Sequence, residues 1–284
     1  MTDYLRPDSL EDALRARDEH PDWLLLAGGT DVMVGFAEKP APSGVIDVFG
    51  LPGLCGVSRE PDGTIRIGAA TTYADILRSP IVQSDLPALA ACVREIGAVQ
   101  IQARGTLGGN VGTSSPVGDT LPVLLALDAR LELASARARR EMAYPDFLVG
   151  YRKTALAPTE IVAAVRFPVV PGRVQHWRKV GTRKAQAISK VMFAGSASLS
   201  PEGKILSPRI ALGAVADRPI RVLAAESVLE GQSPSEPLAD RARDAVISAI
   251  RPITDVRSTA EYRSTVAGNL VRRFVLGLGD APKA

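Results

Sequence analysis

Two glycine pairs, far apart in the sequence, constrain this chain more than any other feature. The first lies in Leu26-Ala27-Gly28-Gly29-Thr30-Asp31, after an apolar run, and the second in Thr106-Leu107-Gly108-Gly109-Asn110. Adjacent glycines lack Cβ atoms, so each loop can turn sharply and present backbone N–H groups to an anion. Turn-forming glycines without a ligand would also explain either loop alone. The two loops together, with hydroxyl and carboxylate neighbours, favour a clamp around a diphosphate and its sugar.

Length and charge exclude several classes of partner. The chain has 284 residues, 46% hydrophobic and 23% charged, enough for one large domain or two to three smaller ones. The net charge is only +3, and the basic clusters near 137–140 and 178–184 have few aromatic residues between them. We therefore expect solvated faces and no nucleic-acid partner. No apolar segment is long enough to span a bilayer or to serve as a secretory signal, which predicts a cytoplasmic protein without direct membrane insertion.

Cysteine and histidine are too scarce for metal chemistry on this chain. Cys55 and Cys92 cannot supply the four ligands of an iron–sulfur cluster or a cysteine-rich zinc site, so we predict no metal site. Both cysteines are interpreted as small buried apolar groups in a reducing compartment. His20 and His176, the only histidines, are interpreted as surface or packing residues. No nucleophile or general base is assigned.

The first half of the chain alternates between helix and strand signals. Ser9 to Asp12 resembles a capping box and opens a short helix. A buried strand over 23–27 enters the first glycine loop, and Asp31 stands where a helix would begin. Further strands are expected at 45–48 and 64–67, and helices at 73–77 and 86–96. This order predicts an α/β arrangement with ligand-bearing loops at strand ends.

The second half reads differently. A hairpin is expected over 131–134 and 139–142, then strands at 160–167, 178–180, 194–199 and 209–215, with a turn at Pro201-Glu202-Gly203. Helices are expected at 223–229, 241–249 and 261–275. This pattern indicates an α+β C-terminal domain beginning near Pro171.

The loops exclude two common nucleotide sites. Neither fits the dinucleotide fingerprint G-x-G-x-x-G, and there is no P-loop lysine pattern, which argues against a standard Rossmann NAD site and an NTPase. Thr30, Thr106, Asn110 and Asp119 near the loops favour a nucleotide of another kind. Asp119 has a second interpretation, as the N-cap of a helix containing Leu121, and the two roles are compatible.

At these residues the chain resembles the FAD-binding medium subunit of molybdenum hydroxylases, a family that includes the flavoprotein subunits of xanthine dehydrogenase and carbon monoxide dehydrogenase. The resemblance covers the whole chain. Its motifs are the two loops, Ser115-Pro116 with Asp119, Tyr4 and Pro7 at the start, Lys179 to Lys184 beside the flavin, and Asp255 to Arg257, Glu261 to Arg263 and Arg272-Arg273 near the end.

The resemblance implies an α+β fold: two α/β FAD-binding subdomains, 1–57 and 58–170, and a C-terminal domain, 171–284, with a small antiparallel sheet and helices. Non-covalent FAD would lie in the cleft between them, its diphosphate on the two loops and its ring near Lys179, for which an exposed strand lysine is the alternative. The implied cofactor-binding residues are Leu26, Ala27, Gly28, Gly29, Thr30, Asp31, Val32, Thr106, Leu107, Gly108, Gly109, Asn110, Asp119, Val162 and Lys179.

The resemblance also implies partners. A large subunit would carry the molybdenum cofactor and a small subunit the 2Fe-2S clusters, as a heterotrimer, and electrons would pass from the clusters through FAD to NAD+ or another acceptor. Two departures stand out: Ile96 replaces a phenylalanine of some members, and Ala187-Ile188-Ser189 replaces an aspartate-containing segment, which leaves the acceptor open. The alternatives are a self-sufficient flavin oxidase or reductase and a non-catalytic nucleotide-binding assembly protein.

Overall fold

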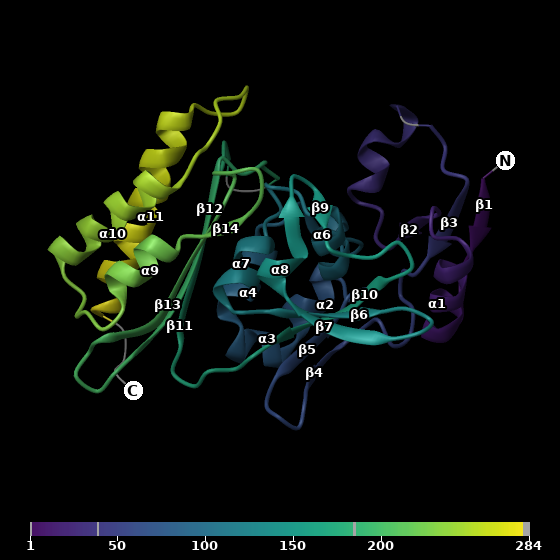
Figure 1. Ribbon diagram of the computed structural model, residues 1–284, viewed down its shortest axis with the longest axis horizontal. Coiled ribbons are helices and arrows are strands. Elements are labelled where there is room, and N and C mark those ends of the chain that lie inside the picture. Colours follow the sequence, from purple (N-terminus) through teal and green to yellow (C-terminus); the bar gives the residue numbers. More distant parts are fainter. Residues whose placement is uncertain (1, 39, 184–185, 281–284) are drawn as a thin grey trace.

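Three main sheets follow one another along the long axis of the molecule. The structure, a computed structural model, describes residues 2–38, 40–183 and 186–280. The N-terminal sheet lies at one end, a five-stranded sheet in the middle, and a four-stranded sheet with the C-terminal helices at the other end (Figure 1). Lys184, in the predicted flavin-side segment, falls outside the described residues.

The N-terminal sheet is parallel. Its order is β1 (Asp3–Leu5), β3 (Gly44–Asp47) and β2 (Leu24–Leu26). Helix α1 (Leu10–Glu19) buries its apolar side here, and the Ser9 hydroxyl accepts a hydrogen bond from the Asp12 N–H at 3.1 Å, so the predicted cap is confirmed. Strand β2 is shorter than expected and only half-buried. After Asp31 the chain forms a 3-10 helix, η1 (Val32–Glu38).

The middle sheet is antiparallel and supports most of the helices. Its strands in order are β4 (Val57–Arg59), β5 (Ile65–Gly68), β10 (Ile161–Phe167), β6 (Arg130–Ala134) and β7 (Arg139–Ala143). The helices are α2 (Tyr73–Arg78), α3 (Pro80–Asp85), α4 (Pro87–Arg94), α5 (Val99–Gln102), α6 (Leu107–Thr113), α7 (Leu121–Ala126) and α8 (Tyr144–Phe147). A hairpin, β8 (Leu148–Gly150) and β9 (Lys153–Thr154), follows α8.

The C-terminal sheet is packed between two helical layers. Strands β11 (Val174–Val180), β12 (Val191–Leu199), β13 (Ile205–Gly213) and β14 (Ile220–Arg221) pair antiparallel in sequence order. Helices α9 (Leu223–Leu229), α10 (Glu236–Ala249) and α11 (Ala260–Leu278) lie on one side, while α4 and α7 contact the other (Figure 1). Because side chains alternate along a strand, Phe193 faces the C-terminal core and Ala194 the middle core.

The mixed helix-and-sheet class predicted from the sequence is confirmed. One cysteine expectation is wrong: Cys92 is buried, but Cys55 is exposed in the bend before β4. His20 stacks on Trp23 with ring centroids 3.9 Å apart, and His176 packs beside Phe193, as packing residues would. None of the helices in the described part of the chain has both the length and the apolar character needed to cross a membrane.

Candidate functional site

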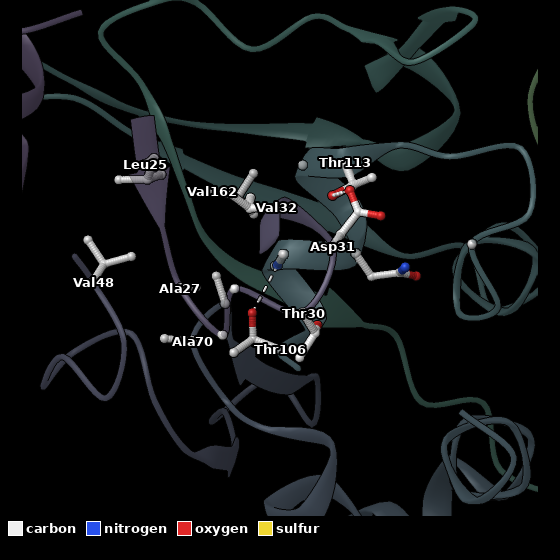
Figure 2. A pocket seen from close by; sticks show the side chains of 18 of the residues that line it. Leu25, Ala27, Thr30, Asp31, Val32, Val48, Ala70, Thr106, Thr113 and Val162 are labelled. Carbon is white, nitrogen blue, oxygen red and sulfur yellow. Dashed lines mark hydrogen bonds between the residues drawn. The ribbon is translucent and has the colours of Figure 1, made fainter. Parts of the chain in front are cut away.

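A cavity of about 470 Å³ lies where the N-terminal and middle parts meet, and both glycine loops line it (Figure 2). All the predicted site residues except Leu26, Leu107 and Lys179 line the cavity. Leu107 is fully buried in the middle core instead. The fold therefore brings together predicted site residues that are as much as 135 positions apart in the sequence, from Ala27 to Val162.

The first loop carries unused backbone donors. Among the described residues, none accepts a hydrogen bond from the N–H groups of Gly28, Gly29, Thr30, Asp31 or Val32. Gly29 has φ +75°, a conformation that L side chains rarely adopt, and it reverses the chain just after β2. A run of unpaired amides around a reversed turn is the arrangement that binds anions in protein nests.

Gly28 joins the first loop to the second. A Cβ built at Gly28 would lie 1.9 Å from the carbonyl oxygen of Arg104, so only glycine allows this approach. The Arg104 guanidinium in turn lies over the Phe49 ring, 3.7 Å from its centroid. These contacts hold the segment before Thr106 against the N-terminal sheet.

The second glycine pair forms the first turn of α6 rather than an open loop. The Thr106 hydroxyl caps this helix by accepting from the Gly109 N–H at 3.0 Å (Figure 2). The N–H of Gly108 donates to the Ala69 carbonyl at 2.8 Å, and that of Leu107 to the Thr71 carbonyl at 3.2 Å. The expectation of free N–H groups in both loops is thus wrong for the second, whose amides the protein itself uses. Helix α6 also lines the cavity at Gly112, where the space for a Cβ is open.

Asp119 connects the cavity to the C-terminal sheet. Its carboxylate accepts from Lys179 Nζ at 2.6 Å and from the Ser189 hydroxyl at 2.8 Å. Burial raises the pKa of Asp119, and the lysine and hydroxyl oppose that rise. The Lys179 side chain is only 7% exposed, so the exposed-lysine alternative is wrong. The N-cap of α7 is Thr120, and no side chain caps this helix, so the capping interpretation of Asp119 is wrong too.

Other polar groups complete the cavity wall. The Asn110 side-chain oxygen accepts from the Thr120 hydroxyl at 2.5 Å. Asp31 lies opposite Thr113 (Figure 2) and accepts from Thr113 at 3.4 Å and from Arg152 at 3.3 Å. Asp31, in the first glycine loop, is therefore held by contacts from α6 and from the turn of the β8–β9 hairpin.

The cavity lining also includes residues that the sequence analysis missed, among them two charged side chains and a tyrosine. Arg17 comes from α1, Tyr73 from the start of α2, and Glu160 from the residue before β10. Burial raises the pKa of the Tyr73 hydroxyl well beyond its usual range, so this group stays protonated. Each belongs to an ordinary helix or strand pattern, and only the tertiary fold brings it to the cavity.

The comparison with known families decides what kind of protein this is. The family described as the FAD binding domain in molybdopterin dehydrogenase matches residues 1–170, and the CO dehydrogenase flavoprotein C-terminal domain matches residues 176–278. The chain belongs to the FAD-binding subunits of molybdenum hydroxylases. It is an oxidoreductase subunit, as the resemblance in its sequence implied.

Similar proteins match this FAD-binding subunit over nearly its full length. It is 34% identical to the nicotine 6-hydroxylase medium subunit of Paenarthrobacter nicotinovorans, over 97% of this chain and 96% of that protein. It is 30% identical to the xanthine dehydrogenase FAD-binding subunit of Escherichia coli O157:H7, over 96% of this chain and 94% of that protein. Its fold superposes on carbon monoxide dehydrogenase from Hydrogenophaga pseudoflava with a TM-score of 0.91 and 30% identity, over 96% of this chain and 95% of that one.

Proposed function

We propose that the cavity holds FAD non-covalently and that this chain is the electron-transfer subunit of a molybdenum hydroxylase complex. The observation that carries the proposal is the run of unpaired amides from Gly28 to Val32, facing a cavity shared with the second glycine segment. The cavity volume of about 470 Å³ falls within the range of small-molecule sites, roughly 300–1,000 Å³. Bound FAD would supply redox chemistry that no side chain of this chain offers.

The proposed residue roles follow from where each one lies. The amides of the first loop neutralise the diphosphate, and Gly108, Gly109 and Asn110 form the opposing wall. Val162 packs from β10. Lys179 acts through Asp119, which it holds in place, rather than by touching the cofactor. Leu26 and Leu107 support the two loops from behind.

We also propose the partners that the resemblance implied. A large subunit carries the molybdenum cofactor and a small subunit carries the 2Fe-2S clusters, because two cysteines cannot ligate even one such cluster here. Electrons pass from those clusters through this chain to NAD+ or another acceptor. The segment Ala187-Ile188-Ser189, which departs from some relatives, ends at the partner of Asp119 and so lies close to the cavity. We propose that this complex is cytoplasmic.

The flavin content of the purified chain, together with turnover by the chain alone and with its partners, tests this function. We expect FAD to bind, no substrate oxidation by the isolated flavoprotein, and oxidation once the molybdenum and iron–sulfur subunits are added. A chain that never takes up FAD would contradict the flavin role and favour an assembly protein. Oxidation of substrate by the isolated flavoprotein would contradict the relay and favour a self-sufficient oxidase. Reduction of NAD+ by the complex decides the acceptor.

We further propose 1–57, 58–170 and 171–284 as the domains. The connection between the last two, residues 168–172, is mostly exposed and follows the last strand of the middle sheet. Limited proteolysis should therefore cut there first and release the C-terminal part, whereas a first cut within a sheet would contradict this boundary.

A further inference from the structure

The positively charged side chain of Arg17 lines the cavity, and the proposed function has not yet given it a role. It lies in the last turn of α1 and lines the cavity from the N-terminal side. One guanidinium nitrogen, Nη1, donates to the Trp23 carbonyl at 2.7 Å, and the buried Nε has no partner among the described residues. Burial lowers the pKa of this guanidinium, and the charge of the Asp22 carboxylate opposes that fall. A guanidinium offers five N–H donors, so a half-buried one with a single bond is poorly satisfied by the protein.

The two ends of the cavity differ in chemistry. Leu25 and Val48 lie on one side, away from Asp31 and Thr113 (Figure 2). Arg17 is tied to the chain next to Leu25, because it donates to the carbonyl of Trp23, directly before β2. Asp119, with Lys179 and Ser189 behind it, lies at the end next to the C-terminal sheet. The first glycine pair connects β2, which carries Leu25, to Asp31, so the diphosphate position proposed above lies beyond Leu25 in the direction of Asp31 (Figure 2).

FAD carries a different ring system on each side of its diphosphate. The isoalloxazine edge, rich in carbonyl and N–H groups, suits the polar end at Asp119. The adenine ring has apolar faces and nitrogen acceptors, which suit leucine and valine walls beside a guanidinium that can stack and donate. The adenosine half therefore fits the end that holds Arg17.

We propose that Arg17 binds the adenosine half of FAD and thereby sets the preference of this site for FAD over FMN. The inference rests on the proposed function, because it requires FAD in this cavity. FMN lacks the adenosine half, so its binding does not depend on Arg17.

Binding titrations of the flavin-free full-length chain with FAD and with FMN test the proposal. Arg17→Met keeps the aliphatic stem and removes the donors, and Arg17→Lys keeps a charge without the planar fork. Arg15→Met is the matched control, since the Arg15 side chain lies on the same helix, is 68% exposed and, within the described part of the chain, pairs with Asp12 alone. Thermal unfolding of each flavin-free variant checks that the fold is retained.

We expect Arg17→Met to weaken FAD binding by about tenfold or more, as loss of a charge-assisted hydrogen bond does, and to leave FMN binding unchanged. The FAD affinity of Arg17→Lys should lie between those of the wild type and Arg17→Met, and the FAD affinity of Arg15→Met should match that of the wild type. Unchanged FAD affinity in a folded Arg17→Met chain, or equal losses for FAD and FMN, would overturn the proposal. A wild-type chain that binds neither flavin would contradict the proposed function itself.

Discussion

At the residue scale, the glycines of the two segments are required for different reasons. Gly28 allows the backbone of Arg104 to approach, and Gly29 has a positive φ. These two requirements hold with or without a ligand, so the conformation of the chain alone explains why both residues of the first pair are glycine. Gly112 has neither requirement, because it is helical with open space beside it on the cavity wall. A substitution at Gly112 should therefore affect ligand binding without disturbing the fold.

Gly112→Leu should weaken FAD binding while leaving the flavin-free fold as stable as before or slightly more so. Leucine fills the cavity, and it favours a helix over glycine by about 0.5 kcal/mol. Gly277→Leu is the control, an exposed glycine in α11 with equally open space but far from the cavity. FAD titration and thermal unfolding measure both effects. Equal FAD affinity in the two variants would place the cofactor elsewhere.

Glu160 gives a pH-dependent contribution to stability at the edge of the cavity. Hydrogen bonds from Arg140 and from the Ala157 N–H hold the pKa of Glu160 below its ordinary value of 4.5. A carboxyl group with a depressed pKa stabilises the fold fully above its unfolded pKa, and that contribution is lost as the pH falls from there through the lower pKa of the folded state. Glu160→Gln should therefore be less stable than the wild type near neutral pH, and the difference should shrink below pH 4.5. Urea unfolding across this range measures it, and a constant difference would contradict the assignment.

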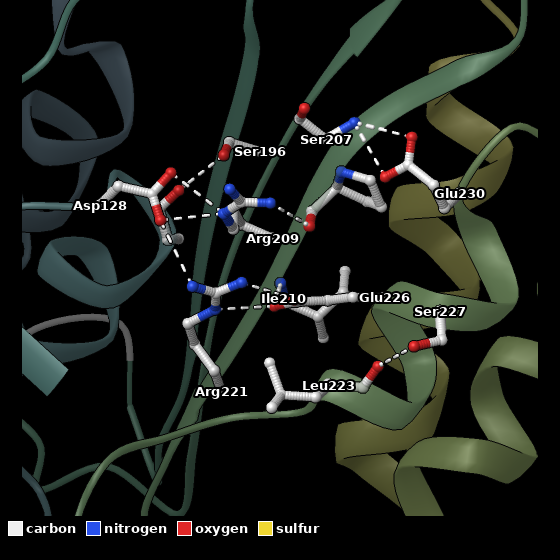
Figure 3. Close-up of polar contacts among 12 residues, drawn as sticks. Asp128, Ser196, Ser207, Arg209, Ile210, Arg221, Leu223, Glu226, Ser227 and Glu230 are labelled. Carbon is white, nitrogen blue, oxygen red and sulfur yellow. Dashed lines mark hydrogen bonds and ion pairs between the residues drawn. The ribbon is translucent and has the colours of Figure 1, made fainter.

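At the scale of elements, α7 ties the middle part of the molecule to the C-terminal sheet. Asp119 precedes it and is held by Lys179 and Ser189. Asp128 follows it, with φ +51°, and accepts hydrogen bonds from Arg209 at 2.8 Å and Arg221 at 3.3 Å (Figure 3), and from Arg173 at 3.2 Å. Every residue of α7 is buried, since the helix packs between two cores. The helix that carries Asp119 is thus fixed at both ends.

The Asp119–Lys179 pair should behave as a coupled unit. Removing one partner leaves a buried charge unpaired, so Asp119→Asn and Lys179→Met should each destabilise the chain by about 3 kcal/mol. The double variant should lose clearly less than the sum, because it leaves no buried charge. Denaturant unfolding of the four proteins completes the cycle. Strictly additive losses would show that the pair does not act as a unit.

Asp128→Asn should destabilise the junction while keeping the backbone conformation, which asparagine tolerates. We expect a loss of about 2 kcal/mol, because the buried guanidinium of Arg173 loses its anion. Asp244→Asn, at an exposed ion pair on α10, should change stability by about 0.5 kcal/mol or less. Unfolding of both variants in urea compares them directly. Similar small effects would contradict a junction role for Asp128.

The sequence predicted elements better than their assembly. Short runs rich in apolar residues located β10, β12 and β13, and the Ser9 cap located α1, because these signals are local. The pairing of Asp128 with Arg209 and Arg221, 81 and 93 residues away, leaves no local signal. For the same reason the glycine pairs revealed the loops, but not that the amides of the second are already bonded. Arg17 is a further case, since an arginine in a short helix looks like an ordinary surface residue.

At the scale of the whole molecule, the three sheets place the cavity between two parts and anchor it to the third (Figure 1). In the relay proposed above, the chain would hold FAD in this cavity and exchange electrons with partner subunits. When substrate is mixed with the assembled wild-type complex, the flavin should be reduced quickly. This reduction should be lost when the iron–sulfur subunit is omitted, even though FAD stays bound. Stopped-flow absorption measures this, and equally fast reduction without that subunit would contradict the relay.

Hydrogen exchange at the backbone amides of residues 28–32, with and without FAD, tests the central claim most directly. These N–H groups have no acceptor among the described residues, so they should exchange quickly in the free chain and slowly once FAD is bound. The amides of residues 107–110 already donate within the protein and should exchange slowly in both states. FAD binding that leaves exchange at 28–32 unchanged would contradict the assignment of the first glycine loop to the diphosphate.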